Sequence, residues 1–174
     1  NEGIDVVVHR TTGVESDDGD VQERVDAGVL DQIRSIDGVD AAAGSIEGFA
    51  QIVDAEGKAT TTDGIGGTMG VAWIDDDRLN PFELLSGHAP QGSKEIVLDK
   101  ATVEDQGWAL GDTVGVLAKD ATTPMTIVGT AGFGDIEGIP GLTVTATAAA
   151  TAQAMFAQPG AYDAVVVAAA EGTT

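Results

Sequence analysis

The order of apolar and polar residues predicts one strand and one amphipathic helix near the start of the chain. The β-branched run Ile4 to Arg10 is typical of a buried strand. After a polar loop, Asp20 with Glu23 three residues later indicates a capping box, and Gly38 stands where a left-handed cap would end a helix. Helical spacing relates the apolar residues between them: Val21, Val25, Val29, Ile33 and Ile36. The pattern predicts a helix over residues 20–37.

An extended segment follows this helix over residues 39–57 and ends in a turn around Gly57. Its small residues indicate a strand that lies close against the helix. Together with the first strand, these elements predict a β-α-β unit over residues 4–53.

Short apolar runs separated by turn signals fill the rest of the chain. They predict strands at Met69 to Ile74, Glu95 to Asp99, a hairpin of residues 112–119 and 125–132, residues 142–146, and Tyr162 to Ala170. Short helical segments are expected at residues 79–87, 100–108 and 148–156. For the second of these, Asp99 is the expected N-cap and Gly107 the left-handed C-cap, which lets Trp108 pack back on Val103.

This organisation predicts an α+β fold with two parts. Strands at turn-like spacing over residues 54–160 suit a small twisted sheet or a partly open barrel. We therefore expect an α+β subdomain made of residues 1–53 and 161–174, interrupted by a β-rich subdomain of residues 54–160.

The charge balance narrows the classes of partner. The chain has 29 acidic and 8 basic residues, for a formal net charge of -21. Such a surface repels nucleic acid, because binding there needs lysine and arginine to displace counterions. Docking on an anionic membrane surface is disfavoured for the same reason. The excess of acid is explained by solubility or by a habitat that favours acidic surfaces; the alternative is an acidic docking face.

Cysteine is absent, which excludes a disulfide framework, thiol catalysis and cysteine-ligated zinc. No run approaches the ~20 apolar residues that span a bilayer, and no signal peptide is visible. The chain begins with Asn1 rather than methionine. We therefore expect a piece of a longer polypeptide whose flanks hold any targeting or membrane segments.

Candidate chemical sites are weak. His9 and His88 have no further ligands at metal-binding spacing, and the acidic clusters 17–20 and 75–77 do not fit a calcium loop. Ser86 lies two residues from His88 without a nucleophile elbow. The glycine-rich run 64–70 precedes a strand rather than the helix that phosphate binding needs. We expect no metal, cofactor or catalytic residue. A catalytic pair of carboxylates stays an open alternative, because 29 acidic residues offer many pairs.

Five short sequence motifs nevertheless occur in the order typical of a known family. Through them the chain resembles the extracytoplasmic core domain of MacB/FtsX-type ABC transporter permeases. The motifs are Ile36-Asp37-Gly38-Val39, Leu84-Leu85-Ser86-Gly87-His88, Glu95-Ile96-Val97-Leu98, Leu110-Gly111-Asp112-Thr113-Val114 and Ile127-Val128-Gly129. The positions that match the family's motifs, all expected to be structural, are Gly38, Val39, Gly87, Glu95, Leu98, Leu110, Gly111, Asp112 and Gly129. Independently of the family, Asp112 after Gly111 is typical of a turn in which the carboxylate accepts backbone N–H groups.

The resemblance implies a porter-like α+β subdomain interrupted by a small β-rich one. It also implies a location outside the membrane, in a dimeric permease served by a cytoplasmic ATPase. Such a domain is non-catalytic, binds a substrate or a partner protein, and relays conformational change. Its two ends should lie close together on the side that faces the membrane.

Three features depart from the family's pattern. His88 stands where arginine is frequent, the excess of acid is larger than expected, and the chain stops before the usual final helix and strand. Two other function classes stay open: a freestanding secreted acidic binding module, and an enzyme that uses a carboxylate pair with a raised pKa.

Overall fold

The computed structural model describes residues 3–16, 19–54, 57–60, 67–119, 121–134, 136, 141–156, 159–170 and 172, and side chains for these except residues 11–22. Its helices are α1 (Ala27–Arg34), α2 (Lys100–Gln106) and α3 (Ala149–Met155). Its strands are β1 (Val6–Val8), β2 (Arg10–Ser16), β3 (Gly19–Glu23), β4 (Val25–Asp26), β5 (Val39–Ser45), β6 (Glu47–Gly48), β7 (Gln51–Val53), β8 (Thr68–Ala72), β9 (Phe82–Gly87), β10 (Glu95–Asp99), β11 (Thr113–Ala118), β12 (Ala121–Phe133), β13 (Thr143–Thr147), β14 (Ala161–Tyr162) and β15 (Ala164–Ala169). The fold class is α+β, as predicted.

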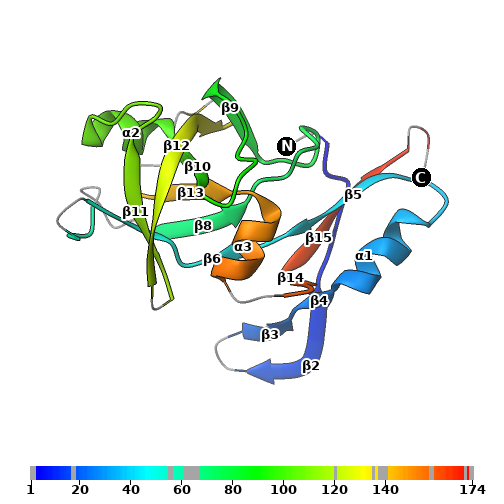
Figure 1. Ribbon diagram of the computed structural model, residues 1–174. Helices are drawn as coiled ribbons and strands as arrows, with labels where there is room; N and C mark the ends of the chain where they lie inside the picture. Colours follow the sequence, from blue (N-terminus) through cyan, green and yellow to red (C-terminus); the bar gives the residue numbers. More distant parts are fainter. Residues whose placement is uncertain are drawn as a thin grey trace.

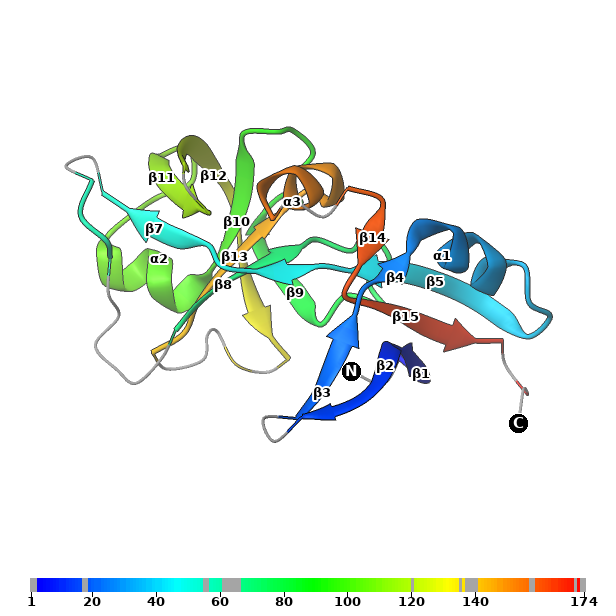
Figure 2. The ribbon, with the colours of Figure 1, turned by 90° about the horizontal axis from the view of Figure 1, so that it is seen from below.

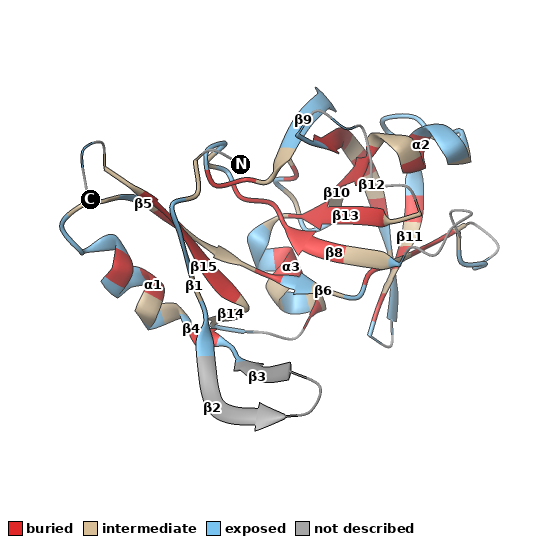
Figure 3. Cartoon of the chain, turned by 180° about the vertical axis from the view of Figure 1, so that it is seen from behind, coloured by how far each residue is buried: buried red, intermediate tan, exposed pale blue. Residues whose placement is uncertain are grey.

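A larger sheet, in which short strands flank the long strand β12, occupies one half of the molecule (Figure 1). Its strand order is β6-β8-β13-β10-β12-β11-β7, with β9 paired to β12. The two end strands, β6 and β7, are separated along the chain only by Phe49 and Ala50, so the sheet must curl round until its ends approach. Apolar side chains fill the inside, among them Ile52, Leu98 and Ile127, which are fully buried. The buried central strands stand out in red in Figure 3.

A three-stranded antiparallel sheet in the order β1-β15-β5 forms the other half. Helix α1 covers one face, where Leu30 and Ile33 pack with Val165, and Figure 2 shows it lying over β5. The loop after β8 covers the opposite face through Ile74 and Leu79. Because the central strand β15 is covered on both faces, its sequence is apolar at every position. The edge strand β1 is less covered, and Val6 and Val7 are 51% and 46% exposed.

The predicted helix over residues 20–37 is wrong in its first half. Residues 19–23 form β3, which pairs with β2 in a hairpin, and Val25 begins β4 against Tyr162. The capping box predicted at Asp20 and Glu23 is therefore also wrong. The actual N-cap is Asp26, whose carboxylate accepts the N–H of Gly28 at 2.8 Å. β-Branched valine suits either structure, and the distant pairing with β14 decides for strand.

The helix also ends earlier than predicted. Ser35 is the C-cap, and Ile36 is 55% exposed in the turn that follows. Gly38 has the predicted positive φ, at 93°, but it shapes the entry to β5 rather than the end of α1.

The short helix predicted over residues 79–87 is also wrong, since this segment is strand β9. The side-chain oxygen of Asn80 accepts the N–H of Phe82 at 3.0 Å, which turns the chain into the strand. β9 then pairs antiparallel with β12 along five residue pairs. The sequence of β9 carries no signal of β12, a partner about forty positions further along the chain.

The strand predicted at Ile4 to Arg10 is present as β1, but it is not buried, since Val6 and Val7 are both exposed. β1 and β5 of the predicted β-α-β unit do not pair with each other, because β15 lies between them.

The remaining predicted elements are confirmed within a few residues. Asp99 caps α2 by accepting the N–H of Thr102 at 2.8 Å, and Gly107 ends it with φ at 70°. The N–H of Trp108 donates to the carbonyl of Val103 at 3.0 Å, as the predicted C-terminal motif requires. The hairpin of β11 and β12 is present, with Ala118 opposite Ala121. In the described residues, no helix has the length and apolar character needed to cross a membrane.

Candidate functional site

The glycines of the matched motifs lie where backbones approach closely. Gly87 has φ at 76°, and a Cβ added there would meet the carbonyl oxygen of Val128. A Cβ at Gly129 would lie 2.7 Å from the carbonyl oxygen of His88. The N–H of His88 donates to Val128 at 3.0 Å. Gly87 and Gly129 thus allow β9 and β12 to pair at this contact.

The Gly111–Asp112 turn fixes the start of β11. The carboxylate of Asp112 accepts the N–H of Ala109 at 2.8 Å, as the Gly-Asp pattern predicts. The N–H of Gly111 donates to Ile127 at 2.8 Å, and the N–H of Ile127 donates to Asp112 at 2.9 Å. Leu110 is 45% exposed beside this turn.

Glu95 closes the loop before β10, since its carboxylate accepts the N–H groups of Gln91 and Gly92 at 2.8 and 3.0 Å. These hydrogen bonds lower the pKa of Glu95 below its ordinary value. Leu98 is fully buried in the larger sheet, and Val39 pairs with Ala169 in the smaller one.

The structure does not gather the nine motif positions into one site. It brings Gly87 beside Gly129, and it places the others at separate turns and in both sheets. Their assignment as the structural motif positions of a permease family stays a prediction.

Ser86 and His88, which are two residues apart in the sequence, are engaged with other partners. The hydroxyl of Ser86 shares a hydrogen bond with that of Thr130 at 2.7 Å, and Nδ1 of His88 lies 2.9 Å from the carbonyl oxygen of Ala89. Ser86 and His88 therefore do not form a nucleophile–base pair here. Within the described part of the chain, no group of three or more histidine, aspartate or glutamate side chains could hold a metal ion.

One carboxyl group does have a raised pKa, but its surroundings are structural. Burial raises the pKa of Asp99 above its ordinary value. One carboxylate oxygen accepts the N–H of Thr102 and the other that of Val144, at 2.8 and 2.9 Å. The adjoining cavity of about 10 Å³ has room for a single water at most. Asp99 joins α2 to β13 and has no space beside it for a substrate.

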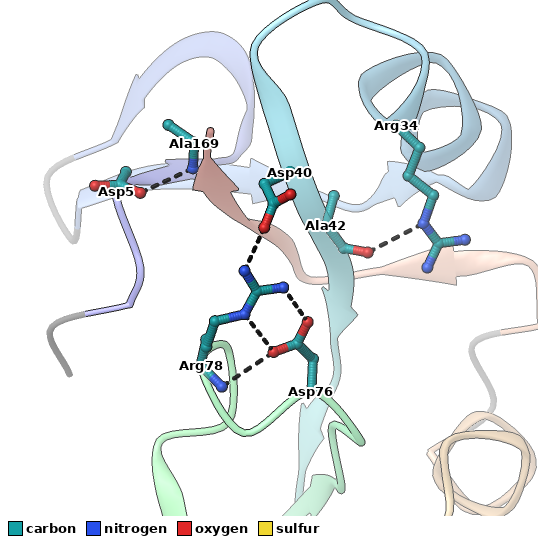
Figure 4. Close-up of polar contacts among 7 residues, drawn as sticks. All are labelled: Asp5, Arg34, Asp40, Ala42, Asp76, Arg78 and Ala169. Carbon is teal, nitrogen blue, oxygen red and sulfur yellow. Dashed lines mark hydrogen bonds and ion pairs between the residues drawn. The ribbon is translucent and has the colours of Figure 1, made fainter. Parts of the chain in front are cut away.

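A charged cluster lies where the two sheets meet (Figure 4). Arg78, from the loop between β8 and β9, binds the carboxylate of Asp40 on β5. It also binds Asp76, with its nitrogens 2.9 and 3.1 Å from the two carboxylate oxygens. The sequence marks Asp76 only as a member of the acidic cluster 75–77. Its contact with Arg78 is local, whereas the contact of Arg78 with Asp40 spans 38 positions that no sequence pattern relates.

Replacing Arg78 with glutamine should raise the pKa of Asp76. Hydrogen bonding by Arg78 holds this pKa below its ordinary value of 3.8. Because the pKa of Asp76 is lower in the folded state, the carboxylate stabilises the fold at pH values above its pKa in the unfolded state. That stabilisation is lost as the pH falls through its pKa in the folded state. A carboxyl-carbon NMR titration measures the change. Arg10→Gln, at a separate ion pair with Glu23, is the control that should leave Asp76 unchanged.

A groove of about 500 Å³ opens beside this cluster. It runs along β5, with Leu30 and Arg34 of α1 on one side and Asp75 and Leu79 of the loop after β8 on the other. Its volume falls in the range of ligand-binding clefts.

A few residues inside the described ends of the chain, Asp5 and Ala169 are neighbours on the small sheet. The N–H of Asp5 donates to the carbonyl of Val167 at 3.0 Å, and the N–H of Ala169 donates to the Asp5 carboxylate at 2.8 Å (Figure 4). β1 pairs antiparallel with β15, with Val6 opposite Val167. The chain therefore enters β1 and leaves β15 at neighbouring positions of the small sheet.

Comparison with known proteins gives a consistent answer for the fold. No family model and no curated protein matches the sequence. Solved structures do match, among them the periplasmic region of MacB from Actinobacillus actinomycetemcomitans, with a TM-score of 0.68 and 12% identity over 99% of this chain and 79% of that one. The extracellular domain of the noncanonic ABC-type transporter YknZ from Gram-positive bacteria matches with a TM-score of 0.64 and 13% identity, over 95% of this chain and 83% of that one. The chain therefore has the fold of these extracytoplasmic transporter domains.

Proposed function

We propose that this chain is a non-catalytic extracytoplasmic domain of an ABC transporter permease. In this role it binds a substrate or a partner protein and relays ATP-driven movement of the membrane part. The parent permease would act as a dimer with a cytoplasmic ATPase. The small sheet with α1 would be the membrane-proximal, porter-like subdomain, and residues 54–160 the inserted β-rich one.

The observation that carries the proposal is the pairing of β1 with β15. A domain inserted between two membrane helices must receive and return the chain at one side. Here Asp5 and Ala169 are hydrogen-bonded to each other, so both connections would run to the same membrane surface. The likeness in fold to MacB and YknZ, over nearly the whole chain, supports the same context.

The sheet pairings suggest a refinement of the proposed subdomains. β6 and β7 lie within residues 47–53, yet both pair with the larger sheet. The junction after the first porter-like part would then fall near Ile46 rather than after residue 53.

Fractionation of cells that express the full-length parent polypeptide tests this function. Membranes are extracted with alkaline carbonate, and intact cells or spheroplasts are treated with protease. We expect the polypeptide to stay in the membrane pellet and protease to cut it within this segment from outside. A cytoplasmic protein that is cut only after permeabilisation is the control. Release into the soluble fraction would contradict the proposal and favour a freestanding acidic binding module.

A further inference from the structure

The groove beside β5 exposes backbone groups at an open sheet edge. Among the strands that the structure describes, β5 is the last of the order β1-β15-β5 and pairs with β15 alone. Val167 lies opposite Ala42, and its carbonyl accepts a hydrogen bond from Asp5 on the β1 side. In an antiparallel pair, backbone groups alternate between the two edges. The N–H and C=O of Ala42 and of Gly44, two residues on, therefore face away from β15.

One of these backbone groups already has a hydrogen bond from a side chain of the same chain. Nε of Arg34 donates to the carbonyl oxygen of Ala42 at 3.0 Å. It thus takes the place that an N–H of an added strand would have. Arg34 is about half exposed, so its guanidinium can move into solvent when another donor arrives. An open edge covered by a charged side chain is a common protection against unwanted pairing.

The shape of the groove suits an extended chain. Its floor is the run from Ala41 to Gly44, where every side chain is a methyl group or a hydrogen. The ring of Tyr162 fills the position that a Cβ of Gly44 would take. The walls are α1 and the loop after β8, which cover the two faces of the small sheet. A strand added to β5 would therefore continue the sheet between these two walls.

The charges at the groove favour a cationic partner. The charged residues that line the groove are Asp40, Asp75, Asp76 and Arg34. Arg78 forms ion pairs with Asp40 and Asp76. The exposed Asp75 stands at the rim, and the whole chain carries a net charge of -21. Complementary charge speeds encounter and selects partners.

We propose that β5 binds an extended, lysine- or arginine-containing segment of a partner protein as an added antiparallel or parallel strand. Backbone hydrogen bonds to Ala42 and Gly44 would hold the segment, and Asp75 would contact its cationic side chains. This recognition mode takes its affinity from the main chain and its specificity from alternate side chains. The proposal deepens the partner binding of the proposed function and rests on that part of it.

Peptide binding to the 174-residue chain tests the proposal. The probe is a blocked nine-residue peptide, KTKVKTKVK in one-letter code, measured by calorimetry. Two further peptides carry N-methyl groups, one on the odd and one on the even backbone nitrogens. Only one edge of an added strand can pair with β5, so one methylated peptide should bind about tenfold or more weakly and the other should keep its affinity. Equal behaviour of the two, or no saturable binding up to about 1 mM, would overturn the proposal.

Two further measurements locate the site. Hydrogen exchange at the Ala42 and Gly44 amides should slow on binding. Asp75→Asn should weaken binding about two- to fivefold at low salt, while Asp105→Asn on α2, exposed and away from the groove, should not change it. Protection elsewhere, or protection of Gly44 by self-association without peptide, would overturn the proposal. The peptide assay contains no membrane, so a lack of peptide binding does not contradict the proposed role in a transporter. Release of the parent polypeptide from carbonate-washed membranes would contradict the transporter role but not the peptide binding.

Discussion

Replacing Gly87 with alanine should lower the free energy of unfolding by about 3 kcal/mol. Gly87 has φ at 76°, a conformation that residues with a Cβ rarely adopt. The added methyl group would also meet the carbonyl oxygen of Val128, a backbone atom that cannot turn aside as a side chain can. Relief of both strains requires β9 to move away from β12, which would break the hydrogen bond between His88 and Val128.

Urea unfolding of the purified chain measures this effect. Gly67→Ala is the matched control, because Gly67 lacks a positive φ and nothing lies within 4 Å of an added Cβ. The control should change the unfolding free energy by no more than about 0.5 kcal/mol. If the two variants were equally stable, the close approach of β9 to β12 at Gly87 would be wrong.

Replacing Asp99 with alanine should lower the unfolding free energy by about 2–4 kcal/mol. The change removes the N-cap of α2 and leaves the buried N–H groups of Thr102 and Val144 without acceptors. Asp26→Ala at α1 is the matched control. Asp26 also caps a helix, but it is exposed and accepts one N–H, so its removal should cost about 1 kcal/mol. Equal losses would mean that the bond to Val144 contributes nothing.

The effect of Asp99 should also depend on pH. Burial raises its pKa in the folded state above the ordinary value of 3.8. The folded state therefore binds this proton more tightly than the unfolded state does. The resulting contribution is present in full below the unfolded pKa and is lost as pH rises through the folded pKa. The difference in stability between the wild type and Asp99→Ala should thus grow as pH falls from 7 toward 3.8. A constant difference would contradict the raised pKa.

Local signals explain which parts of the fold could be predicted. The cap at Asp99, the stop at Gly107 and the turn at Asp112 each depend on atoms within a few residues, and all three are present. By contrast, β4 pairs with Tyr162, more than 130 residues away, and that pairing outweighed a helical pattern of valines. Strand β9 was missed for the same reason, because its partner lies on β12.

The candidate docking groove could not be predicted from the sequence, because it too is formed by residues that are far apart along the chain. Apolar spacing predicted a strand after α1, but it could not show which edge of β5 stays open, since that depends on where β15 returns. Nor does the sequence around Arg78 indicate a bond to Asp40. Motif positions such as Gly87 and Gly111 were recognisable because a positive φ restricts residue type. The floor of the groove is made of the small residues Ala41 to Gly44, which carry little information about position in the sequence.

The pairing of β1 with β15 has a mechanical consequence. Their outer ends, at Asp5 and Ala169, are adjacent. If the two ends are drawn apart, the packing of Ile4 and the hydrogen bond from Ala170 to Gly38 are loaded first. The β1–β15 pairs are then loaded one after another from the Asp5 end. Strands loaded in this way separate at lower force than strands pulled lengthwise past each other. In the proposed permease, a common displacement of both connections would instead move the domain as a rigid body, whereas a motion that separates the two connections would open the β1–β15 pair.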